Sequence, residues 1–425
     1  MLQLLSCALQ GHHLSILRRS RGAEASVVLV LTLGLLCMGC STKQVTPEVA
    51  EIVDLSQIWN HPSEIKLSDF TADIEYVPLE TRPDCLIGDP RGVIVQVLEK
   101  HIAISSGTLL IFDRKGRFLN KIGAIGHGPR EYAGSTRFSV DEKKGRVDIL
   151  DVSRFRVVSF RITGEFIGEF SIKKGNEPLI TRDATGRLGI FYLTNAGDPG
   201  NPTRIEWISD TGEVLDSIPV YTANQKAGGA FMAIFSNLYW SGNDLLFNEN
   251  PLDTIYRLTP ERRWEPRWIV DVGPKRMPSE VSLDLGQFQE GLYRYNLAKI
   301  FQETHRYLIF GTNCGRLGGV AVYDKKTKQA LYMPQPADSA SGLRVLRNDF
   351  DGGPPISSFF FVVVSHSEDY FITPVTPMDL MEAVTKDQKP GSDLLRPDLF
   401  EKVNTLASRL TENDNPVLML VRMKN

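Results

Sequence analysis

One short segment combines residue types that could bind an anion or a ring-shaped ligand. Residues 126–132 read Gly-His-Gly-Pro-Arg-Glu-Tyr. Two glycines let backbone N–H groups approach an anion, and His127 and Arg130 would add charge-assisted donors. Tyr132 could stack on a sugar or an aromatic ligand. This segment is therefore the best candidate for a ligand loop, with His127, Arg130, Glu131 and Tyr132 as its site residues.

The same segment also has a structural interpretation, which we favour. Turns between sheet units are needed whatever a protein does, and Gly and Pro are typical of them. In this interpretation Arg130 and Glu131 pair, and Tyr132 fills a gap between two units. Arg154 and Arg156, with Arg161, form a local basic cluster of the kind that usually marks a solvated strand face.

No catalytic or metal-binding motif accompanies the loop. Nothing resembles the GxSxG nucleophile motif. Asp351 lies in the turn sequence Asp-Gly-Gly-Pro-Pro, but one carboxylate falls short of the roughly six to eight oxygens that Ca²⁺ takes. No i,i+4 pairing or HExxH spacing is shown by the histidines at 61, 101, 127, 305 and 366. We assign no catalytic residue and no metal ligand, and the sequence does not indicate a particular cofactor.

The composition excludes several classes of protein. The 425 residues are 42% hydrophobic and 23% charged, which is near the globular average and unlike a disordered or disulfide-dense chain. Lys and Arg total 48 against 51 Asp and Glu, for a net charge of −3. A dedicated nucleic-acid binder would carry a strong basic excess, so we expect no nucleic-acid partner.

The N-terminus reads as an export signal. Arg18, Arg19 and Arg21 precede the apolar run 27–36, which at 10 residues is short for a bilayer span of roughly 20. Gly39 before Cys40 resembles the lipobox of bacterial lipoproteins, in which the cysteine is diacylated and becomes the new N-terminus, although Cys37 stands where that family prefers Leu. An ordinary secretory signal is the alternative.

We predict a signal peptide over 1–39, lipidation of Cys40, a polar tether over 40–50 and a folded domain over 51–425. Membrane attachment would then be through lipid, in the cell envelope, and we expect the outer membrane. Cys85 and Cys314 could pair in an oxidising periplasm or remain buried thiols.

A repeat of 48 residues predicts the fold. Gly116, Gly164 and Gly212 end three similar segments at spacings of 48, and a further step reaches Pro260 in a similar turn. Each unit is a strand, a tight turn in which Gly supplies a positive φ, and a second strand. A period of 40–50 residues with about four short strands is typical of a β-propeller.

Counting turn motifs gives five blades between about residues 92 and 333. A sixth would combine 359–372, the C-terminal strand 416–423 and an N-terminal strand near 74–79, which removes exposed edges. A solenoid is the alternative, and it predicts no pairing of the termini. Helices are expected within 279–303, after the cap Thr376 and from Pro397, with their apolar stripes packed on a blade.

Several further segments resemble six-bladed β-propeller lipoproteins of bacteria, relatives of the NHL-repeat propellers. They are the loop 126–132, Asp253–Tyr256, Asp351–Pro354 and Asp414–Leu418. The likeness runs over most of residues 70–425 and implies an all-β, six-bladed propeller with a few peripheral helices. Its motifs are turns and closing strands, so it implies no particular reaction.

Two functions follow as hypotheses. The first is a membrane-anchored binding or scaffold module that presents its loops to a glycan, a peptide or a protein of the cell envelope. The second is a metal-dependent propeller hydrolase or lyase, with polar groups from several blades meeting a metal on the axis. The absence of a catalytic motif favours the first hypothesis.

Overall fold

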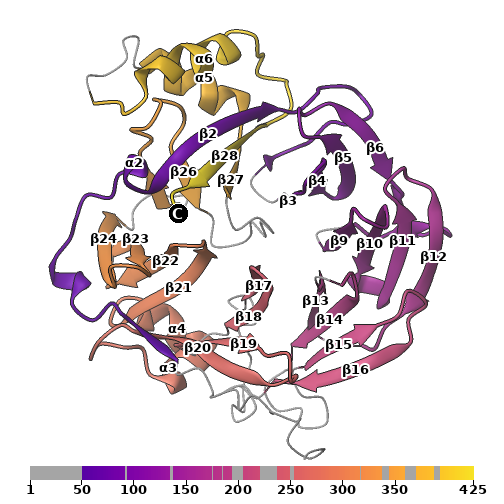
Figure 1. The fold of residues 1–425 in the computed structure, drawn as a ribbon, viewed down its shortest axis with the longest axis horizontal. Coiled ribbons are helices and arrows are strands. Elements are labelled where there is room, and N and C mark those ends of the chain that lie inside the picture. The colour runs from indigo at the N-terminus through magenta and orange to yellow at the C-terminus, as the bar shows by residue number, and fades with distance from the viewer. Residues whose placement is uncertain are drawn as a thin grey trace, which may run out of the picture. The chain divides into compact units, whose positions relative to one another are not determined.

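The protein is described by a computed structural model over residues 50–90, 93–134, 137–174, 176–183, 185–193, 204–220, 237–248, 253–315, 317–336, 344–358, 370–386 and 393–425. All of these residues belong to one compact unit, 49–425. Six small sheets form a ring in this unit (Figure 1). The predicted six-bladed, all-β propeller is thus confirmed, while the signal peptide and Cys40 lie outside the described residues.

Each of the first five blades has four consecutive antiparallel strands, the first innermost (Figure 1). Blade 1 contains β3 (Ile94–Val97), β4 (His101–Ser106), β5 (Thr108–Asp113) and β6 (Phe118–Ile122). Blade 2 contains β9 (Phe138–Asp141), β10 (Arg146–Asp151), β11 (Arg156–Arg161) and β12 (Phe166–Ser171). Blade 3 contains β13 (Asn176–Arg182), β14 (Leu188–Leu193), β15 (Arg204–Ile208) and β16 (Val214–Pro219). Blade 4 contains β17 (Asn237–Ser241), β18 (Asp244–Asn248), β19 (Thr254–Leu258) and β20 (Trp264–Asp271), and blade 5 contains β21 (Asn296–Glu303), β22 (Tyr307–Cys314), β23 (Leu317–Asp324) and β24 (Gln329–Pro336).

The two ends of the chain close the ring, as predicted. In blade 6 the C-terminal strand β28 (Val417–Met423) lies between β27 (Tyr370–Val375) and the N-terminal strand β2 (Thr71–Pro78). The remainder of the predicted strand segment, 359–369, lies outside the described residues. One addition is unexpected: β1 (Glu51–Asp54) joins blade 4 in parallel with β20. Short pairs are formed by β7 (Ala124–Ile125) with β8 (Glu131–Tyr132), and by β25 (Arg344–Leu346) with β26 (Ile356–Ser358).

The core lies between blades because side chains alternate along each strand. On β10, Val147 and Ile149 pack against blade 1, whereas Leu150 packs against blade 3. Six such apolar clusters join successive blades around the ring. Burying a side chain of this size contributes roughly 1.5–3 kcal/mol, so the ring is stabilised mainly by contacts that no blade makes alone.

The repeated turns also connect neighbouring blades. Gly116, Gly164 and Gly212 have φ of 80°, 90° and 91°, which confirms the predicted role of glycine. A Cβ on Gly116 would overlap the carbonyl oxygen of Pro78 on the outermost strand of blade 6, and one on Gly212 would overlap Phe170 on the outermost strand of blade 2. These turns therefore need glycine for two reasons, the backbone angle and the close approach.

The fourth turn departs from the 48-residue step. Pro260 lies in it as predicted, but the left-handed residue is Arg262, 50 residues after Gly212, with φ of 64°. Its guanidinium pairs at 3.2 Å with Asp216 on the outermost strand of blade 3. In the fifth turn Lys328, with φ of 59°, pairs with Glu51 on β1. Here an ion pair connects the blades where the first three turns use close packing.

At several points the outermost strand of a blade has a backbone N–H hydrogen-bonded to a side chain, or its edge is covered by another segment. The backbone N–H of Ile74 on β2 donates to Asp73, and that of Ser217 on β16 donates to Asp216. The edge of β24 is met by the N-terminal segment, where the Ser63 N–H donates to the Tyr332 carbonyl at 2.7 Å. This segment carries η1 (Ile58–Asn60) and α2 (Leu67–Phe70).

The expected helices form, with one shorter than predicted. α5 (Pro377–Lys386) begins after Thr376, whose hydroxyl accepts the Asp379 N–H at 3.0 Å, and α6 (Pro397–Ala407) begins at Pro397. Both pack on blade 6. The stretch 279–303 is helical only as α3 (Ser279–Leu283) and α4 (Leu285–Gly291), because from residue 296 it must supply β21, whose Ile300 fills the core between blades 4 and 5.

Candidate functional site

The predicted ligand loop lies in the connector between the outermost strand of blade 1 and the innermost strand of blade 2. We call residues 123–132 the connector. β7 and β8 pair in parallel at its two ends, and the Gly126 N–H donates to the Tyr132 carbonyl at 3.0 Å. The Glu131 N–H donates to the Gly128 carbonyl at 3.3 Å. The connector is thus a closed loop with its own hydrogen bonds.

Two arginines from blade 2 hold the connector in place. Arg154, in the short helix η3 (Val152–Arg154), donates from Nη2 to the Gly126 carbonyl at 2.7 Å. Arg156, on β11, donates from Nη2 to the Glu131 carbonyl at 2.5 Å. Both pair with Asp151, whose side chain is 1% exposed. Their interpretation as a solvated strand face is therefore wrong for these two arginines, because the connector folds over them.

His127 and Glu131 occupy different sides of the loop. His127 is exposed, and its Nδ1 lies 2.7 Å from Nη2 of Arg154. The Glu131 carboxylate turns inward and accepts the Gly128 N–H at 2.7 Å. A Cβ at Gly126 would overlap this carboxylate, so glycine at 126 allows Glu131 to fold back against the loop.

Tyr132 and Arg130 are placed by aromatic contacts. Tyr132 is fully buried, its hydroxyl donates to the Ile122 carbonyl at 2.7 Å, and its ring meets Phe160 edge-on. That ring is not available to stack on a ligand. Arg130 has φ of 67°, is exposed, and lies with its guanidinium 5.3 Å from the ring centre of Phe166. Tyr132 is thus an interblade packing residue, and Arg130 lies on the surface.

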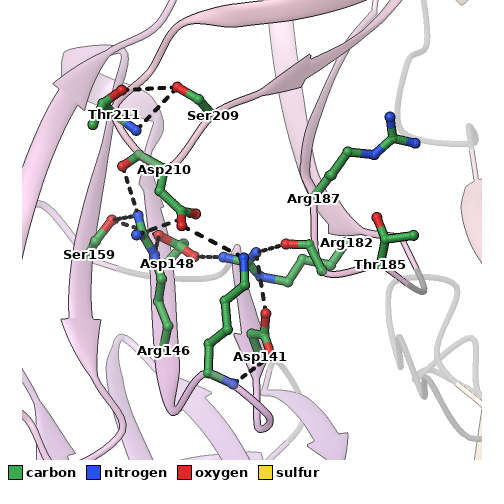
Figure 2. A network of polar contacts seen from close by, with 12 residues as sticks. Asp141, Arg146, Asp148, Ser159, Arg182, Thr185, Arg187, Ser209, Asp210 and Thr211 are labelled. Atoms are coloured by element: carbon green, nitrogen blue, oxygen red, sulfur yellow. Dashed lines mark hydrogen bonds and ion pairs between the residues drawn. The ribbon is translucent and has the colours of Figure 1, made fainter.

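A second polar site lies at the other end of β10, between blades 2 and 3 (Figure 2). Asp148 is completely buried and accepts hydrogen bonds from Arg146 Nε at 2.9 Å and from the Ser159 hydroxyl at 2.6 Å. Its other oxygen accepts from Nη2 of Arg182, which belongs to the innermost strand of blade 3. Arg146 also pairs with Asp210 of the blade 3 turn at 3.4 Å. We call this set the ionic junction.

The ionic junction connects two blades through charge. Arg146 and Arg182 have side chains only 9% and 7% exposed, so both cations depend on buried carboxylates. Among the described residues, Asp141 Oδ2 and Arg182 Nε are buried without a hydrogen-bond partner, and the ion-pair distance between the two side chains is 3.8 Å. Groups of both signs are present and enclosed, so the junction serves as a rigid link between blades.

The turn at Asp351 has the structural role predicted for it. The carboxylate is 1% exposed and accepts from Asn348 at 2.7 Å, from the Gly353 N–H at 3.0 Å and from the Tyr76 hydroxyl at 3.1 Å. Its second oxygen has no hydrogen-bond partner in the part of the chain that the structure describes. Burial raises the pKa of Asp351, and it raises the pKa of Tyr76 well above the usual range.

Cysteines and metal ligands add no further site. Cys85 and Cys314 are both free thiols, so the possible disulfide does not form. Within the described ranges no group of three or more His, Cys, Asp or Glu residues could hold a metal ion. None of the helices in those ranges has the length and apolar character needed to span a membrane.

The domain is similar to one known protein family and to solved structures of other proteins. A family profile described as "Domain of unknown function (DUF4934)" matches residues 50–422. No curated protein matches the sequence. A crystal structure of a candidate exported protein from Bacteroides fragilis is similar, with 18% identity and a TM-score of 0.61, over 88% of this chain and 100% of that one. A member of the DUF4221 family from Bacteroides vulgatus has 10% identity and a TM-score of 0.47 over 84% of this chain and 98% of that one. The first likeness supports the propeller fold, and the second adds nothing to it.

Proposed function

We propose that this chain, which belongs to the DUF4934 family, is an exported binding propeller that presents the connector to a protein partner in the cell envelope. The observation that carries the proposal is the way two arginines hold the loop. Arg154 and Arg156 fix the carbonyl groups of Gly126 and Glu131, while Ile125, His127 and Arg130 stay exposed. A loop fixed before binding loses little conformational freedom when a partner arrives.

A protein or peptide fits this surface better than a glycan. Sugar rings are usually recognised by stacking on an exposed aromatic face, and the one tyrosine of the connector is buried. Ile125 is 53% exposed beside polar side chains, so a peptide could make both apolar and polar contacts with the connector. The metal-dependent hydrolase or lyase gains no support from the described residues.

Attachment to the membrane belongs to the same proposal. The basic flank, the short apolar run and Gly39-Cys40 support export followed by lipidation of Cys40. The exported description of the Bacteroides fragilis protein agrees with export. Kinship with NHL-repeat propellers and location in the outer membrane are parts of the proposal that rest on the resemblance alone.

Site-directed photocrosslinking in cells tests the binding function. A photoreactive amino acid at Pro129, exposed on the connector, is expected to give a discrete adduct with one envelope protein. The matched control places the same group at Thr211, exposed on the blade 3 turn. Arg154→Lys together with Arg156→Lys keeps a positive charge beside the buried Asp151 but removes the guanidinium hydrogen bonds to the connector, and should weaken the Pro129 adduct while the circular dichroism spectrum stays propeller-like. Adducts of equal yield and identity at both positions, or none at Pro129, would refute the connector as the binding site.

A further inference from the structure

The exposed polar side chains at the tip of the connector offer hydrogen-bond donors. An arginine can only donate, so the 2.7 Å contact between Arg154 Nη2 and His127 Nδ1 makes Nδ1 the acceptor. The neutral imidazole then carries its hydrogen on Nε2. Because His127 is exposed, this Nε2–H is available to a bound partner.

The acceptors that the connector contains are largely occupied on its inner side. Arg154 and Arg156 take the Gly126 and Glu131 carbonyl groups, and the Gly128 N–H takes the Glu131 carboxylate. The buried carboxylate of Asp151 pairs with both arginines and offsets part of their positive charge. Two exposed carboxylates flank Phe166, and each is already paired with an arginine: Glu169 with Arg156 at 2.6 Å and Glu165 with Arg161 at 3.2 Å.

Arg130 completes this donor surface. Its guanidinium lies over Phe166 and, among the residues that the structure describes, forms no ion pair. The left-handed backbone at Arg130 is uncommon for a residue other than glycine, although Arg262 and Lys328 adopt it in the blade turns as well. The pairing of Arg130 with Glu131 expected from the sequence is wrong, because the Glu131 carboxylate folds back to accept the Gly128 N–H instead.

Resting on the proposed function, we infer that the partner segment is an acidic peptide. One carboxylate of that peptide accepts from His127 Nε2 and from the Arg130 guanidinium, and a neighbouring apolar side chain packs on Ile125. Charge-assisted bonds of this kind are among the stronger polar contacts. An acidic glycan could satisfy the two donors but would leave Ile125 without an apolar contact.

The test measures binding of fluorescent peptides to the full chain by anisotropy. The probe is the peptide GDELGDELGDEL, with GNQLGNQLGNQL as its uncharged counterpart and a sulfated heparin hexasaccharide as the glycan. We expect the acidic peptide to bind about tenfold more tightly than the amide peptide, and Arg130→Gln to weaken it about five- to tenfold. Arg117→Gln, which changes an arginine 74% exposed on a blade 1 turn, is the matched control and should have no effect.

A second variant separates the donor role of His127 from its structural role. In His127→Asn the side-chain oxygen replaces Nδ1 as acceptor for Arg154, while the shorter amide N–H2 donor does not reach the position of Nε2. Peptide affinity should therefore fall about fivefold without a change in urea midpoint, and His305→Asn is the control because His305 is also exposed. Unchanged affinity in both connector variants, equal binding of the two peptides, or equal binding of heparin would overturn the inference.

These outcomes differ from failure of the proposed function. If the Pro129 crosslink persists while the acidic peptide shows no preference, the connector binds a partner of another chemistry and only the inference is wrong. If neither the crosslink nor peptide binding is seen, the connector is a structural link and both are wrong.

Discussion

Replacing Asp148 with alanine is expected to lower the free energy of unfolding by about 3–5 kcal/mol, the range for removing one member of a buried ion pair. Asp148 has no exposed surface and accepts from two arginines and a serine. Its loss would leave Arg182, 7% exposed, with Asp141 at 3.8 Å as its nearest carboxylate. The cost comes from that stranded charge more than from the lost hydrogen bonds.

Urea unfolding followed by circular dichroism measures this cost. With an m value of about 3 kcal/mol/M, a loss of about 3 kcal/mol shifts the midpoint by about 1 M. Asp210→Ala is the matched control, because Asp210 also pairs with Arg146 but is 49% exposed. Exposed pairs contribute about 0–1 kcal/mol, so the control should shift the midpoint by no more than a third as much.

A double variant tests the physical reason. Asp148→Ala with Arg182→Met removes the carboxylate and its main cation together, and should recover part of the lost stability, since apolar replacement of a buried pair is often close to neutral. The reasoning is refuted if Asp148→Ala costs under about 1 kcal/mol or no more than Asp210→Ala. A double variant less stable than Asp148→Ala would show that charge burial is not the cause.

Three further outcomes are expected. Gly116→Ala should lower the free energy of unfolding by more than about 2 kcal/mol, because its Cβ would overlap the Pro78 carbonyl. Gly134→Ala, at φ of 113° with nothing near its Cβ, should lower it by about 1 kcal/mol. Urea unfolding measures both values, and equal losses would contradict the close approach at Gly116. Burial raises the pKa of Asp351, so the stability that its protonated form contributes is fully present below the ordinary aspartate pKa of 3.8 and is lost as pH rises through the raised pKa. Asp351→Asn should remove this decline in the urea midpoint with rising pH, and an unchanged pH profile would contradict it. Cys40→Ala should move the protein from the membrane fraction to the soluble fraction, and unchanged retention would contradict lipidation.

The fold could be predicted from sequence because its repeat is local. Gly116, Gly164 and Gly212 mark turns that depend on a few adjacent residues, and the strands before them show ordinary β propensity. The left-handed conformation of Arg262 could not be predicted, because an arginine in this conformation has no sequence signature and its ion-pair partner, Asp216, lies in another blade. β1 was missed for a similar reason, since a four-residue strand is recognised only through the edge that it joins.

The candidate site was less predictable. The glycine-rich loop could be located, but the arginines that hold it come 22 or more residues later and look like any basic strand. Only one feature of the sequence indicates the ionic junction. Asp148 interrupts the apolar run Val147–Leu150, and a charge within a buried strand must be paired. Its partners depend on the stacking of blades, which no local pattern encodes.

The hydrogen bonds at the outer strand edges bear on how densely copies of the propeller can lie side by side without associating. If Cys40 is lipidated as proposed, the molecules are confined to two dimensions, where their outer strands meet far more often than in solution. Exposed β-edges would then join neighbouring molecules into ribbons. Asp73 and Asp216 occupy backbone donors on two of those edges, and the segment through Ser63 meets a third. These three contacts would disfavour edge-to-edge pairing between neighbouring copies at the corresponding blades.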